Sequence, residues 1–515
     1  MAAGSAAAAP SAEGPVLSNA MQIAAGLVLA LSNFIVVLDI TIANVSIPHI
    51  AGNLGITPDQ GTWVITSYAV AEAICVPLTG WLAGRFGVVR VFILALLGFG
   101  LFSLICGLSN SLTMLVVARI GQGFAGAPLM PMSQTLMVRV FPPERRNMAM
   151  GGWAMTTLLA PALGPILGGW ISDNFSWHWI FLINVPIAAA AAVAAVAFLR
   201  SAETPSLKLP IDRIGLALLV FWIGCLQVML DIGRDHDWFN DWLIVGLAAG
   251  AIVGFIVFVI WELTEEHPIV DLRIFRHRGF SSAVTTMALS FGAYFASIVI
   301  IPQWLQSSMG YSATDAGLTT AFTAMSAMIM APVAAQMLGK VDPRLMISGG
   351  VLWLAAMSIV RSHWTTDITF WDLSWPQFVQ GFGTVFFFIP LTALCMSSVL
   401  PEEQASAAGL QNFVRTMSIA ISTSVVLTVW DNAQRVAHSD IADRLQPDQT
   451  VASLGNIGMG ADQSRAVIGS IADGQALLVA VDYTFVVAAV VLVFAAAFVW
   501  IAPKPDGPLQ AEIGH

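Results

Sequence analysis

Charged residues are scarce in this chain of 515 residues. Asp, Glu, Lys and Arg make up only 10% of it and 57% is hydrophobic, whereas about a quarter of an ordinary soluble domain is charged. A chain with so few charges does not form a water-soluble globule. The net charge of −10 and the scattering of 21 Lys and Arg residues also argue against a nucleic-acid-binding protein, which needs a basic patch.

Cysteine is rarer still, and the sequence lacks the motifs typical of metal sites, catalytic sites and nucleotide-binding sites. The four cysteines, Cys75, Cys106, Cys225 and Cys395, all lie in apolar runs, so neither a disulfide framework nor a metal site is expected. The sequence has no spacing typical of metal ligands or of a nucleophile and its base, so an enzyme is not expected. It also has no G-x-x-x-x-G-K-[ST] nucleotide-binding motif. With no cofactor expected, energy must come from an ion gradient or from the gradient of a solute.

Hydrophobic runs long enough to cross a bilayer recur along the chain. A helix needs about 20 mostly apolar residues to cross ~30 Å of hydrocarbon. The sequence therefore predicts an all-α integral membrane protein. Its fourteen predicted spans are 21–47, 62–82, 90–108, 112–137, 147–171, 179–199, 214–232, 242–262, 280–302, 314–338, 345–361, 376–398, 406–430 and 476–501.

Positive charge is distributed unevenly between the two sides of the predicted membrane. With the N-terminus inside, 14 Lys and Arg residues fall in inner segments and five in outer ones, while Arg119 and Arg415 lie within spans. Inner loops carry the excess of Lys and Arg, so both termini are predicted to be cytoplasmic. Residues 1–19 contain no Lys or Arg, which predicts a disordered tail before an uncleaved first span rather than a signal peptide.

One outer segment, residues 431–475, is long, polar, Gly-rich and acidic. Two interpretations are open for it. It forms either a small extracytoplasmic cap or docking surface, or a partly ordered spacer.

The chain contains a parallel internal repeat. A shift of 258 positions places span 4 on span 12 and span 5 on span 13, eight spans apart, so the two copies cross the membrane in the same direction. Parallel repeats of this kind build the two halves of major-facilitator transporters. The identities are Gln122/Gln380, Gly123/Gly381, Pro143/Pro401, Glu144/Glu402, Ala149/Ala407 and Gly151/Gly409.

The repeat divides the chain into segments. It predicts a six-helix bundle in 20–200, a linker with two extra spans in 201–279, and a second six-helix bundle in 280–502, followed by a cytoplasmic tail at 503–515.

Charged residues inside spans are functional candidates, since each costs ~2.5–3.5 kcal/mol on insertion scales. Asp39 lies nine residues before Pro48, and Glu72 lies nine residues after Trp63. Both carboxylates are therefore expected ~14 Å below the outer surface, at 1.5 Å per residue. Two carboxylates at one depth should hold protons tightly, as a proton carrier requires. Alternatively, Asp39 forms a structural ion pair or helix cap, and Glu72 is simply hydrogen-bonded.

Two arginines lie within spans. Arg119 enters span 4 from its outer end and is expected to meet Asp39, as the switchable partner of that carboxylate. Arg415 lies ten residues into span 13. It either holds a helix in place or faces a substrate cavity.

Seven motifs carry a specific resemblance to a known family. They are Leu38–Pro48 in span 1, Gly80–Arg90 in loop 2–3, Arg119–Gly126 in span 4, Ala160–Gly169 in span 5, Trp177–Pro186, Ile211–Gly215 and Pro268–Phe275. Together they resemble the EmrB/QacA family of fourteen-span drug:proton antiporters in the major facilitator superfamily, and within it the EmrB type of multidrug efflux subunit. The likeness runs from about residue 21 to 502.

The resemblance implies a function. It implies a proton-coupled exporter of hydrophobic or amphipathic toxic compounds that works by alternating access in a bacterial inner membrane. It also implies a periplasmic membrane-fusion adaptor of the EmrA kind and an outer-membrane channel of the TolC kind. Asp39, Glu72 and Arg119 are the expected proton-coupling residues.

The span-5 motif has small residues on one helical face and prolines beside them. Ala160, Gly164 and Gly168 are spaced by four, which lets helices approach closely, while proline bends a helix. This face either packs ordinarily or, as the resemblance implies, forms the rocking interface between the bundles. The motif residues are Pro161, Gly164, Pro165, Gly168 and Gly169.

The loop 2–3 motif is expected to form a tight cytoplasmic turn through its glycines. Its Arg85 and Arg90 would then face lipid headgroups and the end of span 2. Gly84 stands where the family often has an aspartate, so a gate lock based on that aspartate is in doubt. The gate-loop residues are Gly80, Arg85, Gly87 and Arg90.

Span 12 is rich in Phe and span 10 in Met. These side chains either face lipid and neighbouring helices or line an adaptable pocket, as Met-rich surfaces of promiscuous binders do. They are Phe378, Phe382, Phe386, Phe387, Phe388, Met325, Met328 and Met330.

Two other functions remain open from sequence. One is a narrow exporter of a fatty acid, a siderophore or a metabolite. The other is a non-transporting membrane receptor or scaffold, for which neutralising Asp39 would leave solute flux unchanged.

Overall fold

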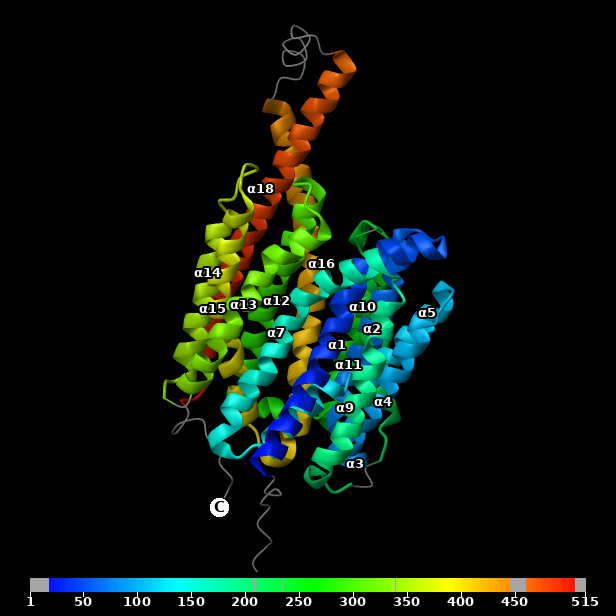
Figure 1. Cartoon of the computed structure of the whole chain (residues 1–515), viewed down its shortest axis with the longest axis vertical. Helices are drawn as coiled ribbons and strands as arrows, with labels where there is room; N and C mark the ends of the chain where they lie inside the picture. Colours follow the sequence, from blue (N-terminus) through cyan, green and yellow to red (C-terminus); the bar gives the residue numbers. More distant parts are fainter. Residues whose placement is uncertain (1–17, 207–209, 235, 339, 445–459, 505–515) are drawn as a thin grey trace, which may run out of the picture.

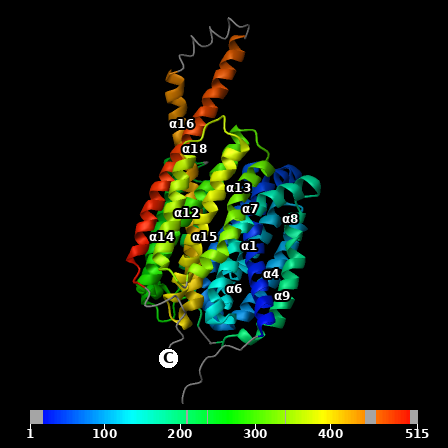
Figure 2. The same cartoon turned by 60° about the vertical axis from the view of Figure 1, so that its left-hand side comes forward.

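The computed structural model describes residues 18–444, except 207–209, 235 and 339, and residues 460–504. Nearly all of the two predicted tails lies outside the described residues, as does 445–459 of the long outer segment. The described chain is all-helical and forms two bundles side by side (Figure 1). Its two described ends lie at the same end of the molecule (Figure 2).

The first bundle contains six spans, several of them built from two helical segments. A 3-10 turn at Val76–Leu78 joins α2 to α3, and α6 follows directly on α5. The segments are α1 (Asn19–Leu54), α2 (Pro58–Cys75), α3 (Thr79–Phe86), α4 (Val88–Gly107), α5 (Leu112–Gly126), α6 (Leu129–Val140), α7 (Pro143–Asn174), α8 (Trp179–Leu182) and α9 (Asn184–Leu199).

Two further helices precede the second bundle. They pack against each other, and α10 also contacts α2 and α16. They are α10 (Arg213–Ile232) and α11 (Trp242–Thr264). The second bundle consists of α12 (Arg278–Ser308), α13 (Ala313–Met337), α14 (Pro343–Arg361), α15 (Phe370–Ser397), α16 (Gln404–Arg444) and α18 (Ala461–Phe498).

The spans agree with the predicted fold class. Within the described residues, 13 helices are long and apolar enough to cross a membrane, and α7, bent by 47°, supplies a fourteenth when its two halves are taken as one span. Side-chain caps set several helix starts. Thr57 and Gln60 form a capping box at α2, and Ser111 accepts a hydrogen bond from the Met114 amide at α5, so donors that lack a partner in the first turn are satisfied.

The bundles meet along two lines of contact. α7 packs along α13, and α16 packs against α3 and α6. The contacts of α16 are very close near the end of the molecule that carries both described ends. A Cβ on Gly80 would lie 2.8 Å from the Cα of Ser406, and Asn412 Nδ2 donates a hydrogen bond of 3.0 Å to Gln134 Oε1. That end of the interface is therefore tightly packed.

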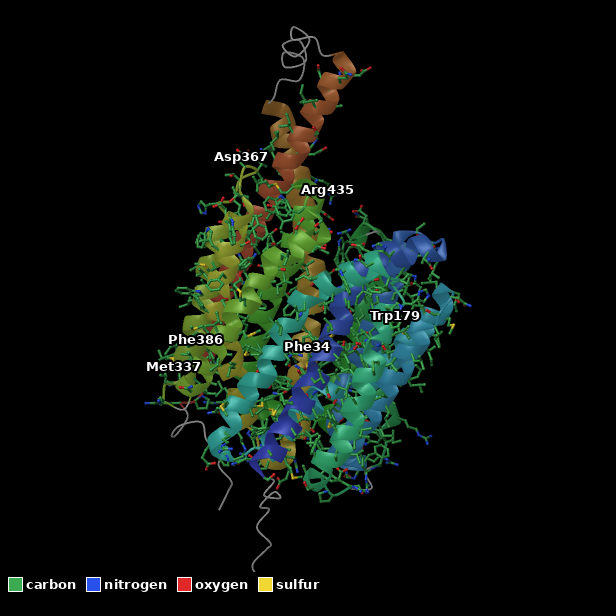
Figure 3. The ribbon with its side chains drawn as sticks, in the orientation of Figure 1. Phe34, Trp179, Met337, Asp367, Phe386 and Arg435 are labelled. Atoms are coloured by element: carbon green, nitrogen blue, oxygen red, sulfur yellow. The ribbon has the colours of Figure 1, made fainter. Side chains whose placement is uncertain are left out.

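The outer segment 431–475 differs from the loop expected from sequence. α16 continues as helix to Arg444, and α18 already begins at Ala461. The two helices project beyond the bundles as a helical extension (Figure 1), and Arg435 lies on it (Figure 3). The apolar spans end near 430 because the sequence becomes polar, but its Ala, Gln and Arg residues favour helix just as well.

Candidate functional site: a buried ion-pair network

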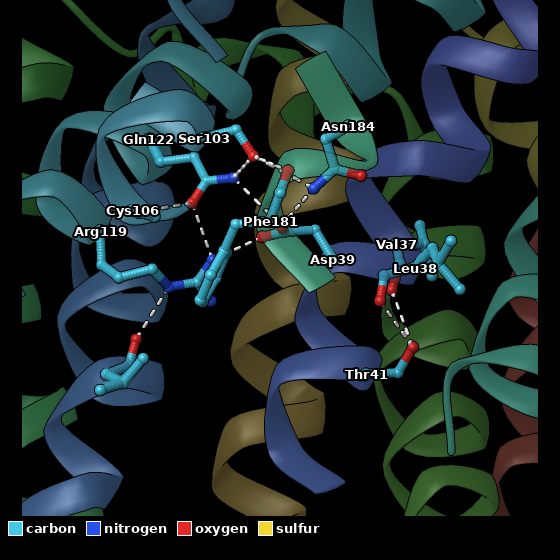
Figure 4. A network of polar contacts seen from close by, with 11 residues as sticks. Val37, Leu38, Asp39, Thr41, Ser103, Cys106, Arg119, Gln122, Phe181 and Asn184 are labelled. Atoms are coloured by element: carbon cyan, nitrogen blue, oxygen red, sulfur yellow. Dashed lines mark hydrogen bonds and ion pairs between the residues drawn. The ribbon is translucent and has the colours of Figure 1, made fainter. Parts of the chain in front are cut away.

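The central feature of the first bundle is a buried ion pair between α1 and α5. Arg119 Nη1 lies 2.5 Å from Asp39 Oδ2, and both side chains are 0% exposed. The sequence predicted that these residues would meet, and the structure brings them together (Figure 4). A hydrogen-bonded pair of opposite charges can remain buried in a medium of low dielectric, whereas either charge alone is strongly unfavourable.

Two neutral donors, one on α5 and one on α9, complete the shell of Asp39. Asn184 Nδ2 donates to Asp39 Oδ1 at 2.7 Å, and Gln122 Nε2 donates to the same oxygen at 3.1 Å. Both amides also donate to Ser103 Oγ, at 3.2 and 3.1 Å, and Ser103 donates onward to the carbonyl of Phe181. The carboxylate on α1 is thus linked to α4, α5, α8 and α9 (Figure 4).

Arg119 has contacts that do not depend on Asp39. Its Nε donates to the carbonyl of Val64 at 2.9 Å, and its Nη1 also donates to Gln122 Oε1 at 2.9 Å. Its guanidinium carbon lies 4.3 Å from the ring centroid of Tyr68. Its Nη2 has no hydrogen-bond partner among the described residues. Arg119 therefore keeps its hydrogen bonds to Val64 and Gln122 when the carboxylate is neutralised, and its Nη2 is available to donate a further hydrogen bond.

Glu72 does not join this network directly. It is 6% exposed, and no basic side chain of the described residues lies within 4 Å of it. Its helix, α2, contacts both α16 of the opposite bundle and α5 of its own bundle. These two helices carry the buried arginines Arg415 and Arg119.

Arg415 crosses the interface between the bundles. It is 4% exposed, its Nη2 contacts Met130 Sδ of α6, and its guanidinium carbon lies 5.8 Å from the ring centroid of Phe291. Its Nη1 has no hydrogen-bond partner among the described residues. Arg415 thus reaches from one bundle to the other, and both alternatives from sequence, a structural role and a place in a substrate cavity, stay predictions.

The small-residue face of α7 does not form the interface between bundles, which corrects the interpretation implied by the resemblance. A Cβ on Gly164 would lie 2.6 Å from the Cβ of Thr41, and one on Gly168 would lie 2.8 Å from the Ile42 carbonyl. This face therefore packs on α1 within its own bundle. The other side of the motif faces the second bundle: Pro161 borders a cavity with α12–α15, and Gly169 approaches Thr314. The Pro165 side chain lies outside the described side chains.

The loop 2–3 motif also differs from expectation. Gly80 and Arg85 lie within α3, and Gly80 contacts α16 instead of forming the turn. Gly87 makes the turn with a φ of 91°, which favours glycine. Arg85 lies 5.4 Å from the Trp81 ring centroid.

A carboxylate that sequence reasoning missed lies at this turn. Glu203, which follows α9, accepts hydrogen bonds of 3.0 Å from the amides of Val89 and Arg90. Its Oε2 also lies 3.8 Å from Arg90 Nε. Negative charge at the start of α4 interacts favourably with the helix dipole.

The Phe and Met residues of spans 12 and 10 are mostly packing or surface side chains. Phe387 and Phe388 are fully buried against Phe291, with ring centroids 5.5 and 5.1 Å apart. Met325 and Met328 are each 46% exposed. This arrangement favours contacts with lipid and neighbouring helices over a pocket.

Comparisons with known proteins agree with this architecture. A family model described as Major Facilitator Superfamily matches residues 29–423. The multidrug export protein EmrB of Escherichia coli (strain K12) is 40% identical over 497 residues, which cover 95% of this chain and 97% of that protein. The chain belongs to the Major Facilitator Superfamily.

Two further known proteins are similar to this chain over almost their full length. The fatty acid resistance protein FarB of Neisseria gonorrhoeae is 38% identical over 496 residues, covering 95% of this chain and 98% of FarB. The crystal structure of the human organic anion transporter MFSD10 (TETRAN) has a TM-score of 0.56 at 14% identity, covering 92% of this chain and 99% of that one. The structural likeness shows the shared fold, and the predicted resemblance to EmrB is confirmed by sequence identity.

Two amide side chains of the buried network, those of Gln122 and Asn184, were not singled out as site residues from sequence. Gln122 appeared only as a match in the repeat, and Asn184 only as part of a motif. A neutral amide inside an apolar run is a weaker signal than a charge. Both nevertheless had a signal, because Gln122 lies one helical turn after Arg119 and Asn184 interrupts an apolar run.

Proposed function

We propose that this protein is a proton-coupled multidrug exporter that moves hydrophobic and amphipathic toxic compounds outward in exchange for protons. The observation that carries the proposal is the fully buried Asp39–Arg119 pair, which four neighbouring helical segments surround. A proton is the smallest ligand that can break such an ion pair, because it neutralises the carboxylate. The E. coli and Haemophilus influenzae relatives are both named multidrug export protein EmrB.

In this mechanism a proton from outside binds Asp39 and removes the charge that Arg119 neutralises. Arg119 then keeps its bonds to Val64 and Gln122, while the neutral carboxyl group no longer holds α1 to α5 by charge. The change biases the bundles toward the state that releases substrate outside. Because a bound ligand shifts an equilibrium only by its differential affinity for the two states, the proton must bind the two states unequally. Glu72 is the second carboxylate proposed to take part, with Arg415 as the opposing charge.

The proton gradient supplies enough free energy for the exchange. One charge crossing 100 mV releases ~2.3 kcal/mol, and one pH unit adds ~1.4 kcal/mol. At ~1.4 kcal/mol per tenfold ratio, each proton sustains a substrate gradient of roughly 500-fold. Neither a nucleotide nor another cofactor enters the mechanism, and the protein is a transporter rather than an enzyme.

The contacts between bundles support alternating access. α16 closes tightly on α3 and α6 at one end of the molecule, and the surface of α7 beside its glycine face packs along α13. Separation at the α16 contacts, with α7 and α13 as the seam about which the bundles rock, would open that end. The α1–α7 contact stays fixed, because its glycines bury α1 within one bundle.

The membrane setting follows from the distribution of charge. The sequence places 14 Lys and Arg residues in inner segments and five in outer ones, and one of those five, Arg361, is buried at the end of α14 in the structure. The excess on the inner side therefore remains, and both termini are cytoplasmic. By analogy with EmrB, the membrane is a bacterial inner membrane. The helical extension of α16 and α18 then points into the periplasm. It is the proposed docking element for an EmrA-like adaptor that leads to a TolC-like outer-membrane channel, and a cavity of about 580 Å³ lies at its base, beside Arg435 and Asp473.

Substrate-induced proton release in proteoliposomes tests the proposal. The wild-type protein is expected to release protons when an amphipathic drug is added, and Asp39→Asn and Arg119→Ala are expected to abolish that release. Glu72→Gln is expected to reduce it. The exposed Arg278 at the start of α12 supplies the control variant Arg278→Gln, which should couple normally. Full coupling by Asp39→Asn would refute the mechanism.

A further inference from the structure

A small cavity borders the second bundle at the position that corresponds to the ion-pair network of the first. It has a volume of about 30 Å³ and lies between the bundles. Its lining includes Pro161 of α7 and, from the second bundle, Ser297, Arg361, Gln377 and Gln380.

The repeat explains why these residues gather. At the offset of 258, four of the five polar residues described in the first network have a counterpart in the cavity wall, and only Asn184 lacks one. The carboxylate of Asp39 in the first bundle is replaced by the hydroxyl of Ser297 in the second. The arginine of the second bundle, Arg361, is on α14, which corresponds to α4 and not to α5, the helix of Arg119. The correspondences are Asp39 to Ser297, Ser103 to Arg361, Arg119 to Gln377 and Gln122 to Gln380.

Arg361 is buried without a carboxylate partner. It is 1% exposed, and no acidic side chain of the described residues lies within 4 Å of it. Its Nη1 donates to Gln377 Oε1 at 3.2 Å and its Nη2 to Ser358 Oγ at 3.3 Å, and its guanidinium carbon lies 5.0 Å from the Phe485 ring centroid. These neighbours are all neutral. A buried cation with only neutral neighbours lacks the counter-charge that Asp39 gives Arg119.

A second observation points to a ligand rather than to packing alone. The Nε2 donor of Gln377 and the Oε1 acceptor of Gln380 have no hydrogen-bond partner among the described residues, although these side chains are only 3% and 2% exposed. Buried polar atoms of this kind are rarely left unpaired. A carboxylate fits between the Gln377 amide donor and the Arg361 cation, because both of its oxygens accept hydrogen bonds and it carries the opposite charge.

We propose that Arg361 and Gln377 bind the carboxylate head group of anionic amphipathic substrates. The inference rests on the proposed export function and names a substrate class for it. The cavity is about as large as the share of liquid volume of one water molecule, ~30 Å³, so in this state it has room for one carboxylate oxygen, and the rest of the head group needs a wider cavity. Pro161 of the first bundle borders it, so separation of the bundles widens it toward the interface. Ile298 and Ile301 also line it and offer apolar contact to the rest of the substrate.

Titration calorimetry with octanoate and octanamide tests the site on purified full-length protein at mildly alkaline pH. The two probes match in length and differ in charge. The wild-type protein is expected to bind octanoate more tightly than octanamide. Arg361→Gln should weaken octanoate binding about tenfold or more, since a charge-assisted hydrogen bond is lost, and should leave octanamide binding within about twofold. Arg278→Gln, at an exposed position on α12, should change neither.

Ser297→Asp gives an independent test that does not remove the arginine. It places a carboxylate at the position that corresponds to Asp39, so it should neutralise Arg361 and abolish the preference for octanoate. If Arg361→Gln fails to fold, this variant decides. Equal binding of the two probes by the wild-type protein, or an unchanged preference in Ser297→Asp, would overturn the inference.

The failure of the export proposal is distinguishable, because calorimetry needs no proton gradient. Octanoate binding that depends on Arg361, without substrate-induced proton release, would contradict the proposed function and leave this inference intact.

Discussion

Asn184 Nδ2 donates a 2.7 Å hydrogen bond to Asp39 Oδ1, which is the carboxylate oxygen opposite the one that Arg119 binds. The first residue of α9 is thereby linked directly to the centre of α1. This bond makes Asn184 a positioning residue for Asp39, the carboxylate proposed to couple protons.

Replacement of Asn184 by alanine tests that role. Asp39 would lose one of its two neutral donors, so the direct link between α9 and the carboxylate on α1 would be broken. We expect Asn184→Ala to lower substrate-induced proton release more than Asn184→Ser, because the serine hydroxyl group is still a donor. Asn174→Ala, on an exposed side chain of α7, is the control. Equal losses in the two Asn184 variants would show that the hydrogen bond to Asp39 does not position the carboxylate.

Glu72 and Arg415 are expected to act as a coupled pair across the interface. Both side chains are buried and lie on helices that contact each other across the interface, so removal of either charge would leave the other without its proposed counter-charge. Glu72→Gln and Arg415→Gln should each lower transport strongly, and the double variant should be less impaired than the sum of the two. A double-mutant cycle on export rates measures this. Strict additivity would show that the two charges act separately.

Gly80 is expected to be required for closure of α3 on α16. A Cβ at this position would lie 2.8 Å from the Ser406 backbone, so Gly80→Val should wedge the bundles apart. Cys75 reports the opening, because it is 7% exposed and its cluster packs against Phe413 of α16. With the other three cysteines replaced by serine, N-ethylmaleimide should alkylate Cys75 several-fold faster in Gly80→Val.

The matched control for this experiment is Gly349→Val on α14, since no atom lies within 4 Å of a Cβ at that position. Equal alkylation rates in the two variants would contradict a closed contact at Gly80.

The glycine face of α7 is expected to be required for stability rather than for motion. A Cβ on Gly164 would lie 2.6 Å from the Thr41 Cβ, and such overpacking costs about 1–3 kcal/mol. Gly164→Ala should lower the unfolding temperature in detergent by several degrees. Thr41→Gly should restore part of the loss. Gly152→Ala, with no neighbour within 4 Å, should be neutral or slightly stabilising. A normal unfolding temperature with loss of transport in Gly164→Ala would instead support a role in rocking.

Asp342, which precedes α14, should give a pH-dependent contribution to stability. Arg344 donates side-chain hydrogen bonds to Asp342 and lowers the pKa of that carboxyl group. A lowered pKa stabilises the fold above the unfolded value of about 3.9, and this stabilisation is lost as the pH falls through the lower folded value. Asp342→Asn keeps a capping oxygen but lacks the charge. It should be less stable by up to about 1 kcal/mol at neutral pH, with a difference that disappears in strong acid. A difference in unfolding temperature that persists there would exclude the ion pair as its cause.

Most of the fold follows from the sequence, because burial in lipid requires long apolar helices. The ends of those helices are less predictable. Hydropathy ends span 13 near 430, although α16 continues to Arg444, since a helix that leaves the membrane needs helix-forming residues but not apolar ones. The same cause places the ends of α1 and α2 beyond Pro48 and before Trp63.

The site was predictable where charge marked it. Asp39 and Arg119 stood out because a charge inside a span is costly, but the neutral donor Asn184 did not. Periodicity correctly grouped Gly164 with the other small residues of α7. It could not show which neighbour they contact, because spacing along one helix carries no information about the partner helix.

The unbroken course of α16 has a mechanical consequence. One helix joins Arg415, at the interface between the bundles, to Arg444, at the tip of the helical extension. The 29 steps between them span ~44 Å at 1.5 Å per residue. If the helix is stiff, each degree of tilt about Arg415 displaces the tip by ~0.8 Å over that length. The extension is thus a lever arm: a small tilt of α16 at the interface between the bundles would move a protein bound at Arg444 by a larger distance.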